Sequence, residues 1–233
     1  MGRIWNKIIH FIKEPHFPFF LLSFLRKISP TLARFLLYGR YNPNTEAYWN
    51  KRYESGGYEE EKYGPLRREI INLIPIKSRV LDAGCGTGTF MEMLRHQKLC
   101  NCIGIDISEV SIQMIKKKGF QGFKCELPSL PSDLEENSFD VCTLIETLEH
   151  LSNPQETLKN LYRILKEGGY IVIAVPNDSM KPEEFDEHVA SFNARSLQDL
   201  VNNYFKVDTL FSVESFGHNY LVLRARKASL SST

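Results

Sequence analysis

The sequence predicts an α/β protein built on a doubly wound, mostly parallel sheet with an antiparallel edge. Short apolar runs alternate with amphipathic helical patterns from Leu66 onward, as expected for a parallel sheet covered by helices on both faces. The last two apolar runs flank the short turn FGHN, which indicates an antiparallel hairpin. Residues 1–40 differ from the rest in charge, so we divide the chain into an N-terminal helical extension (1–40) and one domain (41–233).

The predicted elements follow one another in a regular order. The expected strands are rich in β-branched and apolar residues, and they cover residues 79–84, 102–107, 122–126, 138–146, 170–176, 206–215 and 220–227. The expected helices carry apolar residues at helical spacing, and they cover residues 46–53, 66–74, 89–98, 110–118, 154–167 and 196–205. Helices that separate successive strands are what a doubly wound sheet requires.

The extension is basic and carries apolar helical stripes. Residues 1–40 contain seven Lys and Arg against one acid, and the run RIWNKIIHFIK places Ile4, Ile8, Phe11 and Ile12 on one side of a helix. A second helical pattern follows in TLARFLLYGR. A basic, aromatic helix suits the surface of a membrane, and it equally suits a lid on the domain or a contact between two copies. We therefore expect either a peripheral contact with the inner face of a membrane or one of these packing roles.

Bulk composition excludes some classes of protein. The net charge is +1 and the domain has no basic stripe, which argues against a nucleic-acid partner. The five cysteines are odd in number and form no C-x-x-C pair, so we expect free thiols, a reducing cytoplasmic compartment and no structural zinc. No segment reaches the roughly 20 apolar residues that a membrane-spanning helix needs, and we expect no signal peptide.

A glycine-rich loop follows the first predicted strand directly. In VLDAGCGTG, Gly84 and Gly86 lie where the chain must turn sharply and a ligand can approach backbone amides. In an open parallel sheet this is the carboxyl edge, at which ligands bind. Thr89 replaces the last glycine of a dinucleotide fingerprint, and Asp82 would repel a pyrophosphate but suit a cationic or zwitterionic ligand. The next strand ends at Asp106, which can accept hydrogen bonds from a ribose diol.

From about Glu46 to its C-terminus the chain resembles the class I S-adenosylmethionine-dependent methyltransferases. The motifs VLDAGCGTG, GIDIS, SFDVCTLIETLEHL and RILKEGGYIVIAVPN together carry this resemblance. It implies a Rossmann-like sheet of seven strands with the last one antiparallel, and S-adenosylmethionine as cofactor. In motif style the chain is most similar to O-methyltransferases that act on quinones, lipids and sugars. The resemblance thus implies methyl transfer to an oxygen of a small or lipid-like acceptor. Two alternatives stay open: a sugar or natural-product methyltransferase, and a catalytically silent cofactor-binding scaffold protein.

The resemblance also implies which residues bind the cofactor. Asp82, Gly84 and Gly86 match the positions around its amino-acid end, Asp106 matches the ribose acceptor, and Ile107 matches a position beside the adenine. The remaining cofactor positions lie after the third and fourth strands, and they are Glu126, Leu127 and Ile145. An N-terminal helix often closes over the cofactor in this family, and AYWNKRY resembles it, with the candidate lid residues Tyr48, Trp49 and Tyr53.

The segment IETLEHL raises the question of a metal. On a helix Glu146, Glu149 and His150 would share one face, and two carboxylates with an imidazole can hold a divalent cation. The same E-x-x-E-H spacing occurs in two metal-linked groups that the chain resembles, the quinone-ring O-methyltransferases and the small-RNA 3′-end methyltransferases. Family members without a metal also contain LEHL, so a solvated helix start with a caged histidine is the alternative.

Two histidines are candidates for the proton acceptor in methyl transfer to a hydroxyl group. His150 follows the fourth strand, and His188 lies in the acidic loop after the fifth strand. Both positions belong to the carboxyl edge of the predicted sheet, and histidine titrates close to neutral pH. We therefore expect His188 or His150 to act as the base.

Overall fold

The computed structural model describes residues 24–25, 27–38, 42–56, 64–177 and 185–228. The helix expected at the start of the N-terminal extension lies outside these residues. None of the helices in the described part of the chain is long and apolar enough to cross a membrane.

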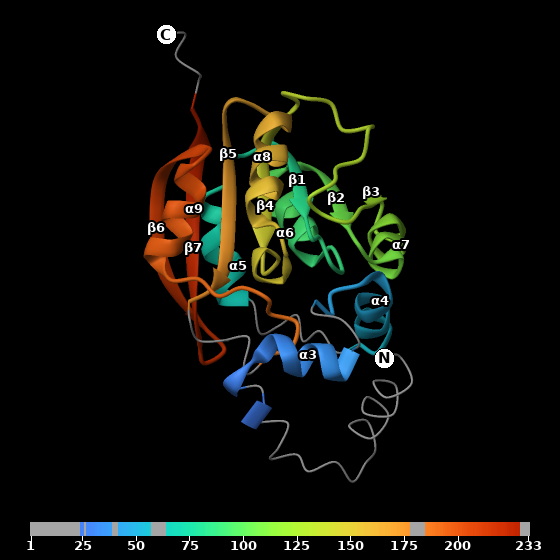
Figure 1. The fold of residues 1–233 in the computed structure, drawn as a ribbon. Coiled ribbons are helices and arrows are strands. Elements are labelled where there is room, and N and C mark those ends of the chain that lie inside the picture. The colour runs from blue at the N-terminus through green and yellow to red at the C-terminus, as the bar shows by residue number, and fades with distance from the viewer. Residues whose placement is uncertain (1–23, 26, 39–41, 57–63, 178–184, 229–233) are drawn as a thin grey trace.

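The core of the fold is a seven-stranded sheet with the order β3-β2-β1-β4-β5-β7-β6 (Figure 1). The strands pair in parallel from β3 to β5, and β7 pairs antiparallel with both β5 and β6. This confirms the predicted sheet and its C-terminal hairpin. The strands are β1 (Arg79–Ala83), β2 (Asn101–Asp106), β3 (Gln121–Lys124), β4 (Phe139–Ile145), β5 (Leu165–Pro176), β6 (Phe205–Ser215) and β7 (His218–Lys227).

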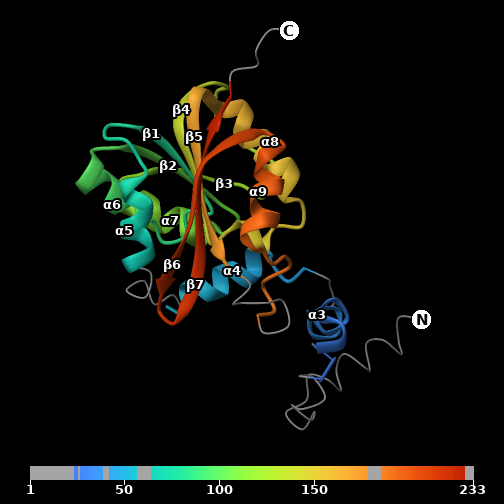
Figure 2. The ribbon, with the colours of Figure 1, turned by 90° about the vertical axis from the view of Figure 1, so that its left-hand side faces the viewer.

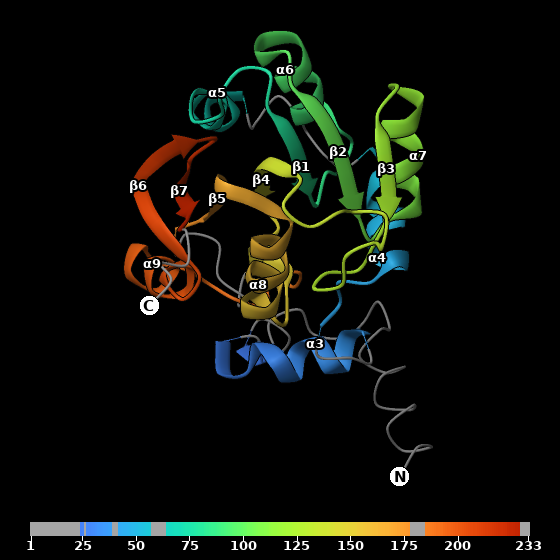
Figure 3. The same ribbon diagram turned by 90° about the horizontal axis from the view of Figure 1, so that it is seen from above.

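Helices cover both faces of the sheet, as Figure 3 shows. One apolar cluster joins one face of the strands to α5, α6 and α7, and a second joins the other face to α8 and α9. Adjacent residues such as Val80 and Leu81 are both fully buried and belong to different clusters. The described helices are α3 (Pro30–Tyr38), α4 (Glu46–Glu54), α5 (Gly64–Asn72), α6 (Thr89–Lys98), α7 (Glu109–Lys117), α8 (Pro154–Ile164) and α9 (Ala194–Asn202).

The helices begin where the sequence offers a cap. The Ser108 side chain accepts a hydrogen bond from the Ser111 amide at the start of α7. At the start of α8 the Asn153 side chain accepts one from the Glu156 amide, and Pro154 follows as the first helical residue. Asn193 forms a reciprocal capping box with Ser196 at the start of α9. These caps place each helix directly after a loop at the carboxyl edge of the sheet.

The chain after β4 does not form the continuous helix that the predicted metal site assumed. Strand β4 ends at Ile145, Glu146 has a left-handed φ of 50°, and only the 3₁₀ turn η2 (Leu148–His150) follows. Val189 and Ala190 donate hydrogen bonds to the carbonyl oxygen of Glu149, which joins this turn to the loop after β5. Glu146, Glu149 and His150 therefore do not share one face of a helix.

Helices α3 and α4 lie across the carboxyl edge of the parallel strands (Figures 1 and 2). The Asn50 side chain of α4 accepts hydrogen bonds from Ser108 and Val110 at the start of α7. Asn44, just before α4, donates to the backbone of His150 and Glu187. The segment that precedes the sheet in sequence thus closes over the edge at which the functional residues were predicted.

Candidate active site

A cavity of about 300 Å³ opens at the carboxyl edge, between the ends of β1, β2 and β4 and helix α4. All the residues predicted to bind the cofactor line this one cavity, and they are Asp82, Gly84, Gly86, Asp106, Ile107, Glu126, Leu127 and Ile145. They come from four separate loops. The fold therefore brings together in one place the residues that the sequence assigned to one ligand.

The glycine loop has a conformation that side chains would prevent. Gly84 and Gly86 have φ values of 82° and 52°, a region that residues with a Cβ rarely adopt. A Cβ on Gly84 would also collide with the side chain of Thr147. The Gly84 and Cys85 amides donate to the Ile105 carbonyl at 2.8 and 3.1 Å, which holds the loop against β2. The loop is thus fixed before any ligand binds.

Two buried aspartates flank the loop. Asp106 accepts hydrogen bonds from the amides of Gly86 at 3.0 Å and Ser108 at 2.9 Å, and Asp82 accepts one from the Thr143 hydroxyl at 2.6 Å. Burial raises the pKa of both Asp82 and Asp106 from 3.8 to about 6, although these hydrogen bonds oppose the rise. Both groups are ionised at neutral pH and place negative charge at the cavity wall.

Helix α4 forms the cover of the cavity. Trp49 and Tyr53 are buried and line it, and the Tyr53 hydroxyl lies next to Gly86 and hydrogen-bonds Asp106. Tyr48 does not line the cavity. It packs edge-on against Trp49 and faces Glu187, and burial raises its pKa to about 12. Two of the three candidate lid residues thus contact the cavity, and the third packs behind them.

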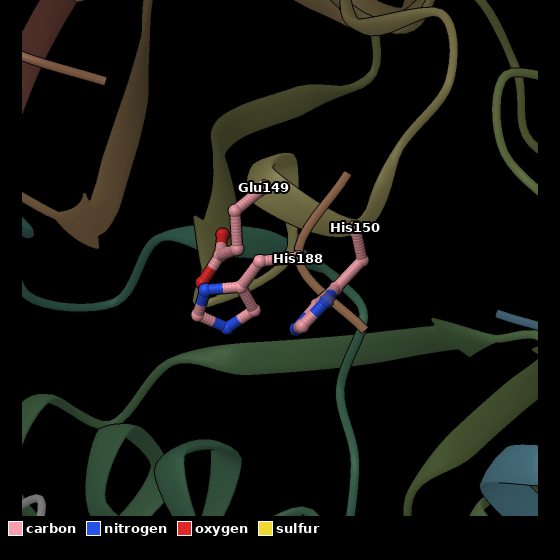
Figure 4. Close-up of side chains that lie close together, drawn as sticks. All are labelled: Glu149, His150 and His188. Carbon is pink, nitrogen blue, oxygen red and sulfur yellow. The ribbon is translucent and has the colours of Figure 1, made fainter. Parts of the chain in front are cut away.

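A buried cluster of one carboxylate and two imidazoles lies beside the cavity (Figure 4). Each of Glu149, His150 and His188 offers a ligand atom, and these atoms lie within 4.8 Å of one another. The ring centroids of the two histidines are 5.0 Å apart. Glu149 is 2% exposed, and neither of its carboxylate oxygens has a hydrogen-bond partner among the described residues. A buried carboxylate without a partner is costly unless a cation or a proton satisfies it.

The composition of this cluster differs from the predicted set of metal ligands. His188 takes the place that the sequence prediction gave to Glu146, which is outside the cluster and lines the cavity instead. Glu146 lies near Arg67 and Tyr220, and burial raises its pKa from 4.5 to about 8. Burial, together with the nearby Glu146, also raises the pKa of Glu149 well above its usual value.

The histidines are held by backbone and amide contacts. His150 Nδ1 lies 2.9 Å from the carbonyl oxygen of Glu187, which leaves Nε2 for another partner. Asn44 Nδ2 donates to the His150 and Glu187 carbonyls at 3.2 and 2.7 Å, and the buried Arg34 donates to the His188 carbonyl at 3.1 Å. Burial and the neighbouring His188 lower the pKa of His150 to about 3. His150 is therefore neutral at physiological pH, a form that can ligate a metal but takes up a proton poorly.

Sequence reasoning missed several residues of the site. Arg67 lines the cavity and lies close to Asp82 and Glu146, but nothing in α5 marks it among three consecutive polar residues. Asn44 and Arg34 reach the histidine cluster across 106 and 154 residues of sequence. No local pattern encodes such contacts, because tertiary packing alone brings these side chains to the cluster.

The chain is similar to known methyltransferases. A family model described as a methyltransferase domain matches residues 26–209. The ubiquinone biosynthesis O-methyltransferase of Coxiella burnetii is 32% identical over 126 residues, which are 50% of this chain and 52% of that protein. The 24-methylenesterol C-methyltransferase 2 of Arabidopsis thaliana is 32% identical over 130 residues, which are 51% of this chain and 36% of that protein. The matches thus span about half the length of the first relative and about a third of the second.

Solved structures share the fold. One is the 1,6-didemethyltoxoflavin-N1-methyltransferase of Burkholderia thailandensis with bound 1,6-didemethyltoxoflavin and S-adenosylhomocysteine. It superposes with a TM-score of 0.66 at 18% identity over 79% of this chain and 87% of that one. The family model covers most of the chain, and the sheet has the seven strands and the antiparallel edge that the resemblance implied. The chain therefore belongs to the methyltransferase-domain family and contains a class I S-adenosylmethionine-dependent methyltransferase domain.

Proposed function

We propose that the protein transfers a methyl group from S-adenosylmethionine to an oxygen of a small or lipid-like acceptor. The observation that carries this proposal is the single cavity in which the predicted cofactor residues meet Glu146 and His150. The names of the relatives support the class of acceptor, since one acts in ubiquinone biosynthesis and the other on a sterol. A sugar or another natural product is the alternative acceptor.

The residues around the cavity suit the parts of the cofactor. Asp106 would accept hydrogen bonds from the ribose hydroxyls, which would take the place of the Tyr53 hydroxyl beside the two backbone donors of this carboxylate. Asp82 and the amides of the glycine loop would face the charged amino-acid end. Arg67, which lines the same cavity, is placed to pair with the carboxylate of that end.

The remaining cofactor residues are less polar. Ile107 and Leu127 would flank the adenine ring, with Glu126 at its polar edge and Ile145 beside the methionine chain. Trp49 and Tyr53 cover the cavity and would keep water away from the reacting atoms. When bound, the cofactor supplies an electrophilic methyl group, and the walls of the cavity orient the acceptor toward it.

We propose that the buried cluster activates the acceptor hydroxyl. The unpartnered carboxylate of Glu149 and the neutral imidazole of His150 fit a divalent cation, which would be held by Glu149, His150 and His188. Such a cation lowers the pKa of a bound hydroxyl group. Without a cation, we propose His188 as the proton acceptor, since burial lowers the pKa of His150 to about 3 and makes it a weak base.

Calorimetry with S-adenosylmethionine tests the proposed function at its first step. We expect saturable binding with one site, followed by transfer of a labelled methyl group from the cofactor into a lipid or an aqueous fraction of a cell extract. Label in the lipid fraction would support a lipid-like acceptor, and label in the aqueous fraction would favour a sugar. Failure to bind the cofactor would leave a catalytically silent scaffold.

Thermal unfolding of the chelator-treated protein tests the cation. We expect Zn²⁺, Mn²⁺ or Mg²⁺ to raise the melting temperature of the wild type but not of Glu149→Gln, because a cation that binds only the folded state stabilises it. Glu156→Gln is the matched control, since Glu156 is an exposed acid whose carboxylate pairs with Lys159 on α8. If no metal separates the wild type from Glu149→Gln, activity should instead depend on His188 alone.

A further inference from the structure

Glu146 is an acid of the cavity that the proposed function leaves without a task. It follows β4 directly, and its backbone has a φ of 50°, a left-handed conformation that is unfavourable for a residue with a Cβ. The amide of Glu146 donates to the Ala174 carbonyl at 2.8 Å, which holds the chain in this conformation. Strained backbone of this kind is concentrated at functional sites. Here the strained residue is one whose side chain lines the cavity.

Glu146 has charged neighbours at both ends of the cavity. At the proposed cofactor end it lies near Arg67, which also lies near Asp82 beside the glycine loop. At the other end it lies near enough to Glu149 of the buried cluster to raise the pKa of that carboxyl group. A methyl group that passes from the cofactor to the acceptor has to cross the region between these two ends. Glu146 is therefore placed beside the path of transfer.

The charge of Glu146 is only partly compensated. The described residues that line the cavity include one arginine, Arg67, no lysine, and four acids, which are Asp82, Asp106, Glu126 and Glu146. Arg67 and a hydrogen bond with Tyr220 favour the ionised form of Glu146, but burial outweighs them and raises its pKa to about 8. A bound cation would supply the missing compensation.

The charges of the cavity match those of the cofactor one for one. The methionine part of S-adenosylmethionine carries a carboxylate, an ammonium group and a sulfonium. In the proposed function Arg67 pairs with the carboxylate, and Asp82 faces the ammonium group. Ionised Glu146 is the remaining charge of this group of three neighbours, and the sulfonium is the remaining charge of the ligand.

We propose that the carboxylate of Glu146 binds the sulfonium of S-adenosylmethionine and thereby distinguishes the cofactor from S-adenosylhomocysteine. The inference rests on the proposed function and deepens it. S-adenosylhomocysteine has a neutral thioether in place of the sulfonium, so it lacks the charge that Glu146 recognises. All other contacts of the two ligands with the cavity are shared, and Glu146 therefore favours binding of the substrate over binding of the product.

Calorimetry of the full chain with each of the two ligands tests this role. The titrations are carried out at pH 8.5, above the pKa of Glu146, for the wild type and for Glu146→Gln. We expect the affinity for S-adenosylmethionine to fall about tenfold or more, because an attraction between opposite charges in a buried cavity is lost. The affinity for S-adenosylhomocysteine should change by less than about twofold. Since glutamine keeps the size of the side chain, this retained affinity also shows that the cavity is intact.

Two other acids of the same cavity provide matched controls. Glu126→Gln is the same substitution at the proposed adenine end, and Asp106→Asn removes the proposed partner of the ribose hydroxyls. Both ligands contain adenine and ribose, so each control should weaken their binding by equal factors. Sinefungin carries an ammonium group in place of the sulfonium methyl group. Its affinity should fall in Glu146→Gln as that of S-adenosylmethionine does, which assigns the effect to charge.

Three results would overturn the inference while both ligands bind the wild type. The first is an equal loss of affinity for the two ligands in Glu146→Gln, and the second is no loss for either. The third is a loss for S-adenosylmethionine without a loss for sinefungin, which would assign Glu146 to the methyl group and not to the charge. Absence of binding of both ligands to the wild type would instead refute the proposed function, and this inference with it.

Discussion

The two ends of the cavity are built in different ways. The polar part of the proposed cofactor end comes from two short segments, Asp82 to Gly86 and Asp106 to Ile107, at the carboxyl ends of the adjacent parallel strands β1 and β2. The end that we propose for the acceptor is assembled from α3, Asn44, η2 and the loop that carries His188, with contacts that span 106 to 154 residues of sequence. At the first end the backbone makes the site. At the second, side chains from distant segments make it.

This difference determines how each end should respond to substitution. A loop that presents backbone amides has little tolerance, because any added atom changes its path. A cluster held by several side-chain hydrogen bonds loses one support at a time, so single changes should reduce activity gradually. Cofactor affinity and the rate of methyl transfer therefore report on the two ends separately.

The largest effect is expected for Gly84→Ala. The new Cβ would collide with Thr147 in a residue whose φ is 82°, so both overpacking and backbone strain act at once. We expect the free energy of unfolding to fall by about 3 kcal/mol or more and cofactor binding to be lost. Urea unfolding and calorimetry measure the two quantities.

Gly168→Ala separates strain from collision. Gly168 has a similar φ of 72°, but its Cβ would meet no atom within 4 Å. Its variant should lose only about 1–2 kcal/mol of stability and keep its cofactor affinity. Adding Thr147→Gly to Gly84→Ala removes the colliding side chain and should restore part of the lost stability. If Gly84→Ala behaves like Gly168→Ala, the loop is not the rigid element described above.

A smaller effect is expected for Asp106→Asn. The change keeps the size of the side chain but removes the charge that would accept the ribose hydroxyls, and hydrogen bonds to a charged group are worth about 2 kcal/mol. Cofactor affinity should fall about thirtyfold in calorimetry. Asp140→Asn is the control, because Asp140 also accepts a backbone hydrogen bond, from Arg79, but lies at the amino end of β4. Equal affinities for both variants would remove Asp106 from the site.

The sequence predicts the proposed cofactor end of the cavity better than the proposed acceptor end, because the first is built from segments that are close in sequence. The C-terminal hairpin and the seven strands agree with the pattern of apolar runs, and each predicted cofactor residue lines the cavity. These features are local, since a strand, a glycine loop and an acid after the next strand are adjacent in the sequence. Their roles toward the cofactor stay predictions until the variants are measured.

The acceptor end was predicted less well because its neighbours are distant in sequence. The motif around Glu149 suggested one helix that carries Glu146, Glu149 and His150. The left-handed backbone at Glu146 ends the strand before such a helix can form, and His188 joins Glu149 and His150 from another loop. The basic, apolar extension indicated a lid or a surface helix without choosing between them. Only the tertiary structure shows that α3 packs on the domain through Arg34, which is 5% exposed and donates to the carbonyl of His188.

The pH dependence of cofactor binding tests the buried aspartates. Binding favours ionised Asp82 and Asp106, whose pKa values are about 6, so affinity should be full above that pH and fall as the pH drops through 6. At pH 5 the loss should be about tenfold for each group, because each pH unit below the pKa protonates it tenfold more. Calorimetry near pH 6 in buffers of different ionisation enthalpy should show release of protons on binding.

The contribution of these groups to stability should have the opposite sign. Their pKa is higher in the folded state than the ordinary value of 3.8, so the folded protein binds protons more tightly than the unfolded chain. The stability that they contribute is full below about pH 3.8 and is lost as the pH rises through 6. In the double variant Asp82→Asn, Asp106→Asn, denaturant unfolding of the ligand-free protein should lack this component. Parallel pH profiles for the variant and the wild type would contradict the raised pKa values.

The smallest effect is expected for Arg34→Ala, and it tests the link between α3 and the histidine cluster. The buried guanidinium donates to the carbonyl of His188 at 3.1 Å, so its loss frees the backbone that carries this imidazole. A small displacement of a group near the reacting atoms slows the reaction, because methyl transfer depends on alignment. Since Asn44 still holds the neighbouring Glu187 carbonyl, we expect the loop to stay in place and the rate of methyl transfer to fall by only about fivefold. Cofactor affinity should not change.

A conservative variant and an exposed arginine distinguish positioning from a general loss of stability. Arg34→Lys keeps one donor toward the His188 carbonyl and should recover part of the rate of methyl transfer. If Arg34 had a merely structural role, the rate of each variant would fall only as far as its free energy of unfolding falls. Arg195→Ala removes a side chain that is 92% exposed and should leave the rate unchanged. If Arg34→Ala weakened cofactor binding as much as it slowed the reaction, the two ends of the cavity would be coupled. The division between a site made by backbone and a site made by side chains would then fail at α3.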